Sequence, residues 1–161
     1  MKIIYFKAVV AALGQADLAT GVYHLPSCPE GAAPGTAAWD DFTGRYRRGP
    51  IATIFYNREG QEPMSPRVFA GGLAINVLAG LIVATMMSYV AAGGAPYIRR
   101  ANVGGMSGLF AALVGHLASW NWMAFPLPYT VVMMADLVIG WSLAGLAMAL
   151  VIRPPQAPRA A

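Results

Sequence analysis

Four polar side chains interrupt the apolar stretches of the sequence, and their types suggest chemistry: Asp17, Asn76, His116 and Asp136. A carboxylate inside a bilayer is unfavourable, so it usually faces a helix bundle or a water-filled cavity. A histidine between two carboxylates can hold a proton near neutral pH. If the four side chains meet, their cluster suits a proton path or the binding of a polar headgroup. Alternatively, they satisfy one another's hydrogen bonds and fix the register of the helices.

Other kinds of site have less support in the sequence. His116, Asp17 and Asp136 offer mixed nitrogen and oxygen ligands, but no ligand spacing within one helix supports a metal site. Haem needs an axial ligand such as histidine, and the second histidine, His24, is expected at the membrane surface. The sequence contains no glycine-rich phosphate loop and no nucleophile–base motif. We therefore expect no catalytic residue, no metal and no cofactor.

Apolar stretches long enough to cross a bilayer would position these side chains. A membrane-spanning helix needs about 20 mainly apolar residues. Ser65 followed by Pro66 is typical of a helix start, and Arg153 followed by two prolines is typical of a helix end. The sequence predicts an all-α polytopic membrane protein, a four-transmembrane-helix bundle forming one domain over 1–161. Its helices are expected at about 3–24, 66–92, 101–120 and 128–152.

Composition supports a membrane protein. Hydrophobic residues make up 57% of the 161 residues and charged residues 11%, whereas about 25% of a soluble domain is charged. The 11 basic residues outnumber the 7 acidic ones, but they flank apolar segments and so predict topology rather than nucleic-acid binding. The single cysteine, Cys28, excludes an internal disulfide.

Small residues share a helical face with the polar ones, at steps of four, and small residues let helices approach closely. From the rise per residue, the four polar side chains are expected about 6 to 15 Å below the outer membrane surface. We therefore expect one shared polar cluster, with helix packing by Gly72, Gly80, Gly104, Gly108, Gly140 and Ala144.

The N-terminal segment has three interpretations. A retained helix over 3–24 is favoured by the polar and small residues that share one face, at Lys7, Gly14, Asp17, Gly21 and His24. A signal peptide is the second, with Gly14-Gln15-Ala16 as the cleavage site. The third is lipidation at Cys28, on a weak motif match.

The remaining segments indicate topology. The loop over 25–65 is expected to be irregular at first and to contain a short strand at 51–56 followed by a turn. The tail over 154–161 is expected to be disordered. Short basic segments favour the cytoplasm, which places both termini inside and the loop outside a bacterial inner membrane. An interfacial aromatic belt is expected from Trp120, Trp122, Phe125 and Tyr129.

A series of short motifs covers about two thirds of the chain in a fixed order: Pro63-Met64-Ser65-Pro66-Arg67, Gly108-Leu109-Phe110-Ala111 with His116, Trp120-Asn121-Trp122 with Phe125-Pro126, Tyr129-Thr130, Asp136, Gly140-Trp141 and Leu143-Ala144-Gly145-Leu146. In this the segment from about 48 to 151 resembles a family of small, uncharacterised bacterial integral membrane proteins. The resemblance implies a retained N-terminal helix and four helices, and it supplies no catalytic residues. The N-terminal segment, with Lys7 and Asp17, is more polar than such relatives would have.

Taken together, these features predict a non-enzymatic membrane protein that serves as an accessory or assembly subunit. Its expected partners are the lipid bilayer and either further copies of itself or a larger membrane complex, with no nucleic acid. The alternative is a small transporter or proton-coupled protein that uses Asp136, His116 and Asp17. A membrane enzyme is the least supported of the three.

Overall fold

The computed structural model of the chain describes residues 7–60, 62 and 64–155, and they divide into two compact units. The N-terminal unit comprises Met1–Glu62, and the helical unit comprises Pro63–Ala161. The sequence predicted a single membrane domain, so this division is a new feature.

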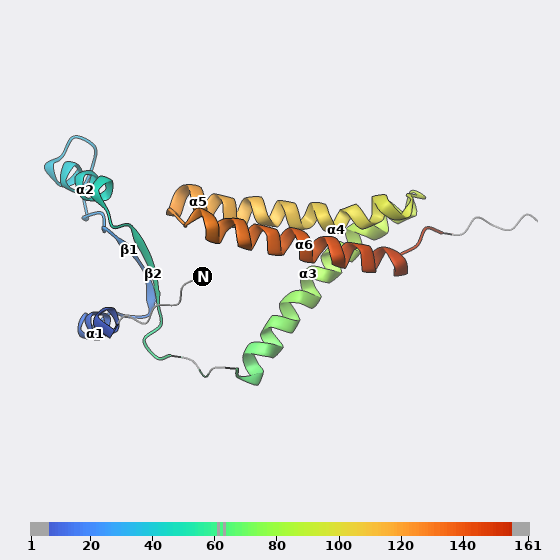
Figure 1. Ribbon diagram of the computed structural model, residues 1–161, viewed down its shortest axis with the longest axis horizontal. Coiled ribbons are helices and arrows are strands. Elements are labelled where there is room, and N and C mark those ends of the chain that lie inside the picture. The colour runs from blue at the N-terminus through green and yellow to red at the C-terminus, as the bar shows by residue number, and fades with distance from the viewer. Residues whose placement is uncertain (1–6, 61, 63, 156–161) are drawn as a thin grey trace, which may run out of the picture. The chain divides into compact units, whose positions relative to one another are not determined.

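The described part of the N-terminal unit contains two helices and a two-stranded sheet (Figure 1). Strand β1 (Gly21–Leu25) pairs antiparallel with β2 (Ala52–Tyr56), with Gly21 opposite Tyr56 and Leu25 opposite Ala52. The short strand predicted at 51–56 is therefore confirmed. Its partner strand was not foreseen.

The helices of this unit are short and lie on its surface. Helix α2 (Ala37–Arg48) begins where the hydroxyl of Thr36 accepts a hydrogen bond from the amide of Trp39. It ends at Gly49, whose φ of 69° suits glycine. No residue of α2, or of α1 (Lys7–Gln15), is buried. The unit thus has little core of its own.

The predicted helix over 3–24 is wrong from residue 16 onward. Helix α1 ends at Gln15, and Asp17 adopts a left-handed φ of 42°. Five residues later the backbone is extended, and β1 makes its hydrogen bonds across to β2 rather than along a helix. The valine and tyrosine of β1, Val22 and Tyr23, also favour a strand. Residues 1–6 lie outside the described residues.

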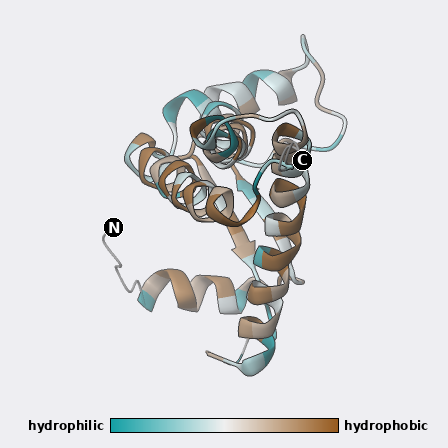
Figure 2. Ribbon diagram, turned by 90° about the vertical axis from the view of Figure 1, so that its right-hand side faces the viewer, coloured by the Kyte–Doolittle hydropathy of each residue, from teal (hydrophilic) through white to brown (hydrophobic). Residues whose placement is uncertain are grey.

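The helical unit contains three helices long and apolar enough to cross a membrane, counted over the described residues. They are α3 (Pro66–Ala92), the continuous segment Tyr97–Met123 and α6 (Leu127–Val151). The middle segment joins α4 (Tyr97–Ala111), the π-helical turn η1 (Ala112–Leu117) and α5 (Ala118–Met123). Figure 2 shows hydrophobic residues along these helices. The predicted all-α membrane protein is thus confirmed in its helical character, with three candidate membrane-spanning helices, whereas the four-helix bundle is not confirmed.

Helix limits follow the start and stop signals of the sequence. The hydroxyl of Ser65 accepts a hydrogen bond from the amide of Val68, and Pro66 occupies the first turn. The helix predicted at 66–92 is observed with the same limits. The helix predicted at 128–152 is observed at 127–151. The third begins earlier and ends later than the predicted 101–120. From residue 156 on, the predicted tail lies outside the described residues.

Helices α4 and α6 lie side by side along most of their length, whereas α3 crosses them only near its C-terminal end (Figure 1). The buried residues of α3 are all in that second half: Val83, Met87 and Ala91. Met87 packs with Ala101 of α4 and Ala149 of α6 in the hydrophobic core. The first half of α3 therefore leaves open space beside the other helices.

Candidate functional site

Backbone contact between α4 and α6 forms the rigid side of the candidate site. A Cβ atom added at Gly104 would lie 2.6 Å from the Cα atom of Gly145, and one added at Gly108 would lie 2.6 Å from the carbonyl oxygen of Leu137. No side chain fits between the helices at these points, so only glycine permits this approach. Of the residues predicted for helix packing, Gly104 and Gly108 lie at this contact.

The other small residues predicted for packing lie away from it. A Cβ atom added at Gly72, Gly80 or Gly140 would meet nothing within 4 Å. Gly145, which does lie at the contact, was missed. The predicted packing face was the row of α6 residues spaced by four from Asp136. The face that contacts α4 is the adjacent row, formed by Leu137, Trp141 and Gly145.

The small-residue faces of α3 and α6 instead share an open groove of about 420 Å³. We call it the α3–α6 groove. It brings together Asn76 of α3 and Asp136 of α6, which the sequence predicted to be close. The remaining lining residues are Gly80, Leu137, Gly140, Trp141, Ala144 and Met148.

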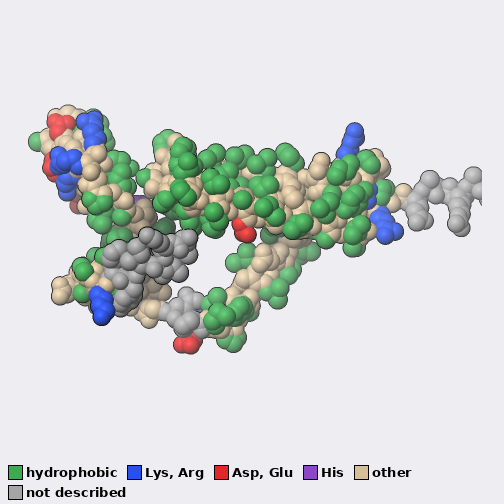
Figure 3. Space-filling view, in the orientation of Figure 1, with side chains coloured by type: hydrophobic (Ala, Val, Ile, Leu, Met, Phe, Trp, Pro, Cys, Tyr) green, Lys and Arg blue, Asp and Glu red, His purple; other side chains and the backbone are tan. Residues whose placement is uncertain are grey.

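The polar groups of this groove are unequally satisfied. The side-chain amide of Asn76 donates to the carbonyl of Gly72 in its own helix, at 3.0 Å. Asp136 is exposed, and within the described chain its carboxylate has no hydrogen bond or ion pair. Figure 3 shows how the helical unit is mostly hydrophobic on the visible face, with basic side chains at one end. In a bilayer, a carboxylate in such surroundings needs a donor from outside the chain or from water.

His116 occupies a different place. It lies half-buried in η1, and it is not among the residues that line the α3–α6 groove. A π-helical turn inside a membrane-length helix often marks a functional site. Within the described residues, no three metal-binding side chains come together.

Asp17 has a partner within the N-terminal unit. Its carboxylate lies 3.0 Å from the guanidinium of Arg58, and 84% of its side chain is exposed. This ion pair follows from the left-handed turn after α1, which the helical interpretation of 3–24 did not contain. Within the helical unit, the α3–α6 groove brings together Asn76 and Asp136 of the predicted cluster, and His116 does not line it.

We expect Asp17→Asn to change the free energy of unfolding by less than about 1 kcal/mol, because exposed ion pairs contribute little. Thermal unfolding of the purified protein in mild detergent measures this. Arg58→Gln, which removes the other partner, is the matched control and should behave alike. If Asp17→Asn alone lowered the free energy of unfolding by several kcal/mol, Asp17 would have to be a buried residue, which would contradict this expectation.

The four residues of the predicted aromatic belt lie around the turn between α5 and α6. Trp120 and Trp122 belong to α5, with 80% of Trp122 exposed. Phe125 and Tyr129 contact each other edge to face, with ring centroids 6.0 Å apart. This is the position that amphipathic rings take at a membrane surface.

Comparison of the chain with protein-family models, with curated proteins and with solved structures found no match. The grooves and charges of the helical unit are therefore the basis for a proposed function.

Proposed function

We propose that this chain is a non-enzymatic integral membrane protein that associates with a further transmembrane helix through the α3–α6 groove. That helix belongs to a second copy or to a larger membrane complex. The observation that carries the proposal is Asp136, a carboxylate at membrane depth without a partner in the described chain. Association would supply the donor that the carboxylate lacks.

The shape of the groove supports an occupant with close backbone approach. Gly80 lines it from α3 and Gly140 from α6, and a Cβ atom added at either would meet nothing within 4 Å. Small residues on both walls are typical of helix–helix interfaces in membranes. Because the buried residues of α3 all lie nearer its C-terminal end, the α3 wall of the groove, at Asn76 and Gly80, remains open.

Charge distribution supports an orientation in a bacterial-type inner membrane. Arg99 and Arg100 open α4, and Arg153 follows the end of α6. Short basic segments remain in the cytoplasm, so three crossings place the C-terminus inside and residues before 66 outside. The predicted cytoplasmic N-terminus depended on a fourth crossing over 3–24, which the strand at Gly21–Leu25 interrupts.

The decisive experiment compares association of two glycine variants purified from native membranes in mild detergent. Gly140→Leu fills the groove, whereas Gly71→Leu adds the same side chain at another open helical position outside it. We expect Asp136→Leu to weaken association about tenfold, since interhelical hydrogen bonds in membranes contribute about 1–2 kcal/mol. We expect Gly140→Leu to weaken it to a similar extent, because its side chain prevents close approach of the second helix. Gly71→Leu should leave it unchanged.

Native mass spectrometry gives the stoichiometry of copies and partners for each variant. If the unaltered protein is isolated alone as a monomer, or if Gly71→Leu and Gly140→Leu weaken association equally, the proposal is wrong.

Proton-coupled transport is the second candidate, because Asn76 and Asp136 line one open cavity large enough for water. Asp136→Asn separates the two functions: an amide keeps hydrogen bonding but cannot exchange a proton. In reconstituted vesicles a transporter would lose proton-coupled flux on this change. An assembly subunit would keep its partners.

A further inference from the structure

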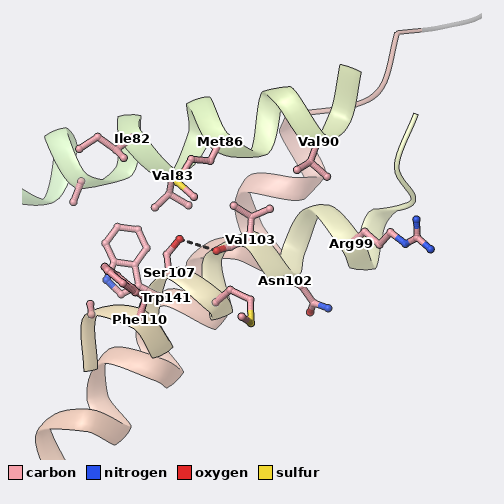
Figure 4. Close-up of a pocket in the computed structure, with 13 residues that line it drawn as sticks. Ile82, Val83, Met86, Val90, Arg99, Asn102, Val103, Ser107, Phe110 and Trp141 are labelled. Carbon is pink, nitrogen blue, oxygen red and sulfur yellow. Dashed lines mark hydrogen bonds between the residues drawn. The ribbon is translucent and has the colours of Figure 1, made fainter. Parts of the chain in front are cut away.

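A second groove, between α3 and α4, has a volume of about 690 Å³ and an almost wholly apolar lining. We call it the α3–α4 groove. Figure 4 shows α3 along one side and α4 along the other, with Trp141 of α6 near the end marked by Phe110. Its walls carry Ile82, Met86 and Val90 from α3 and Val103, Met106 and Phe110 from α4. None of these six residues lines the α3–α6 groove, whereas Trp141 lines both grooves.

The length of this groove matches one leaflet of a bilayer. Its α4 wall runs from Arg99 to Ala111, which corresponds to about 18 Å of helix rise. Its α3 wall, from Ala79 to Val90, corresponds to about 16 Å by the same rise. Half of a hydrocarbon core is about 15 Å thick. An occupant would therefore enter at the membrane surface and end near the midplane.

The charge at the surface end is uncompensated. Arg99 lies at that end of the groove and is exposed, with its guanidinium directed outward (Figure 4). The described part of the helical unit contains one acidic residue, Asp136, which lines the other groove. Ser107 in the groove donates to the carbonyl of Val103, at 2.8 Å, so its hydroxyl is satisfied. Arg99 is thus the group that would attract a phosphate at the membrane surface.

We propose that the α3–α4 groove binds an acyl chain of an anionic phospholipid, with the lipid phosphate held by Arg99. A flexible chain fits this almost wholly apolar lining, in which Ser107 is satisfied and Asn102 lies one helical turn from Arg99, toward the surface end. Its length also matches a groove that stops near the midplane. A transmembrane helix is a poorer occupant, because it would continue through the other leaflet and is about 10 Å wide. The proposal uses only the helical unit in a bilayer and is independent of association through Asp136.

Fluorescence of Trp141 reports lipid contact in either groove, and variants of residues that line only the α3–α4 groove assign the signal to it. The variant Trp39→Phe, Trp120→Phe, Trp122→Phe keeps Trp141 as the single tryptophan. It is reconstituted into two kinds of phosphatidylcholine vesicle. One contains a small fraction of phosphatidylglycerol with brominated chains, and the other contains the same fraction of phosphatidylcholine with brominated chains. Bromine quenches tryptophan on contact. We expect brominated phosphatidylglycerol to quench Trp141 about fivefold more strongly per lipid than brominated phosphatidylcholine. This factor corresponds to the attraction between one arginine and an anionic headgroup, about 1 kcal/mol.

Two pairs of variants locate the effect. Arg99→Gln should remove the preference for phosphatidylglycerol, whereas Arg153→Gln, at the same end but outside the groove, should keep it. Ala79→Phe fills the deep end and should lower quenching by both lipids. Ala74→Phe makes the same change on α3 outside the groove and should have no effect.

Equal quenching of Trp141 by the two brominated lipids would overturn the proposal. Equal loss of preference in Arg99→Gln and Arg153→Gln would overturn it as well, since a general surface charge would then explain the result. If the single-tryptophan variant does not fold, native mass spectrometry of the unaltered chain from the same vesicles decides. Retained phosphatidylglycerol supports the groove, and equal retention of both lipids contradicts it.

Discussion

We expect Gly104→Leu to separate α4 from α6 and to lower the free energy of unfolding of the helical unit by about 3 kcal/mol or more, above the usual range for overpacking. An added Cβ atom at this position would lie 2.6 Å from the Cα atom of Gly145 and would also collide with the carbonyl of Trp141. Both obstacles involve backbone, which cannot rotate away as a side chain can. The helices must therefore move apart, and the contacts of Gly108 with Leu137 are then lost too.

Thermal unfolding in mild detergent, followed by circular dichroism, measures the effect of Gly104→Leu. Gly71→Leu is its control, because a Cβ atom there meets nothing within 4 Å. We expect the control to stay within about 0.5 kcal/mol of the parent, as for surface substitutions in general. Equal loss in both variants would show that helix composition, rather than the contact of α4 with α6, sets the stability.

The limits of the long helices could be predicted because their signals are local. Ser65 and Pro66 act within one turn of the helix they begin. The middle segment begins at Tyr97 instead of residue 101, so the predicted range left Arg99 and Arg100 outside the helix. They lie within its first turn instead.

The faces of these helices were harder to predict. Glycine and alanine occur on several sides of α6, so a periodicity of four can be started from more than one residue. Starting from Asp136 selected Gly140 and Ala144, which line the α3–α6 groove. Starting from Leu137 would have reached Gly145, which packs on Gly104. The choice between the two depends on where α3 crosses, and that is a tertiary property.

The N-terminal segment was misjudged for a related reason. A helical periodicity does occur around Lys7 and Gly14, and α1 is a helix there. From Gly21 on, the backbone conformation is decided by pairing with β2, some thirty positions later in the sequence. Local periodicity carries no information about such a partner. The ion pair of Asp17 with Arg58 depends on the same long-range pairing.

Arg100 shows what sequence reasoning missed at the basic end of the helical unit. Both arginines were interpreted as topology signals, but Arg100 is 6% exposed. Its guanidinium donates to the carbonyl of Ala95 at 2.7 Å and to that of Ala149 at 3.1 Å. The second carbonyl belongs to the last turn of α6, where carbonyls have no partner within the helix. Arg100 thus joins the turn between α3 and α4 to the end of α6.

We expect Arg100→Met to lower the free energy of unfolding by about 3 kcal/mol, because two hydrogen bonds from a charged donor are lost and a buried carbonyl is left unpaired. Methionine keeps much of the aliphatic stem, so lost packing contributes little. Arg99→Met is the matched control: its side chain is exposed, and in detergent without phospholipid it should change stability by less than about 0.5 kcal/mol. Thermal unfolding compares the two, and hydrogen exchange should show faster opening at the end of α6 in Arg100→Met alone. Equal behaviour of the two variants would mean that Arg100 contributes only charge at the membrane surface.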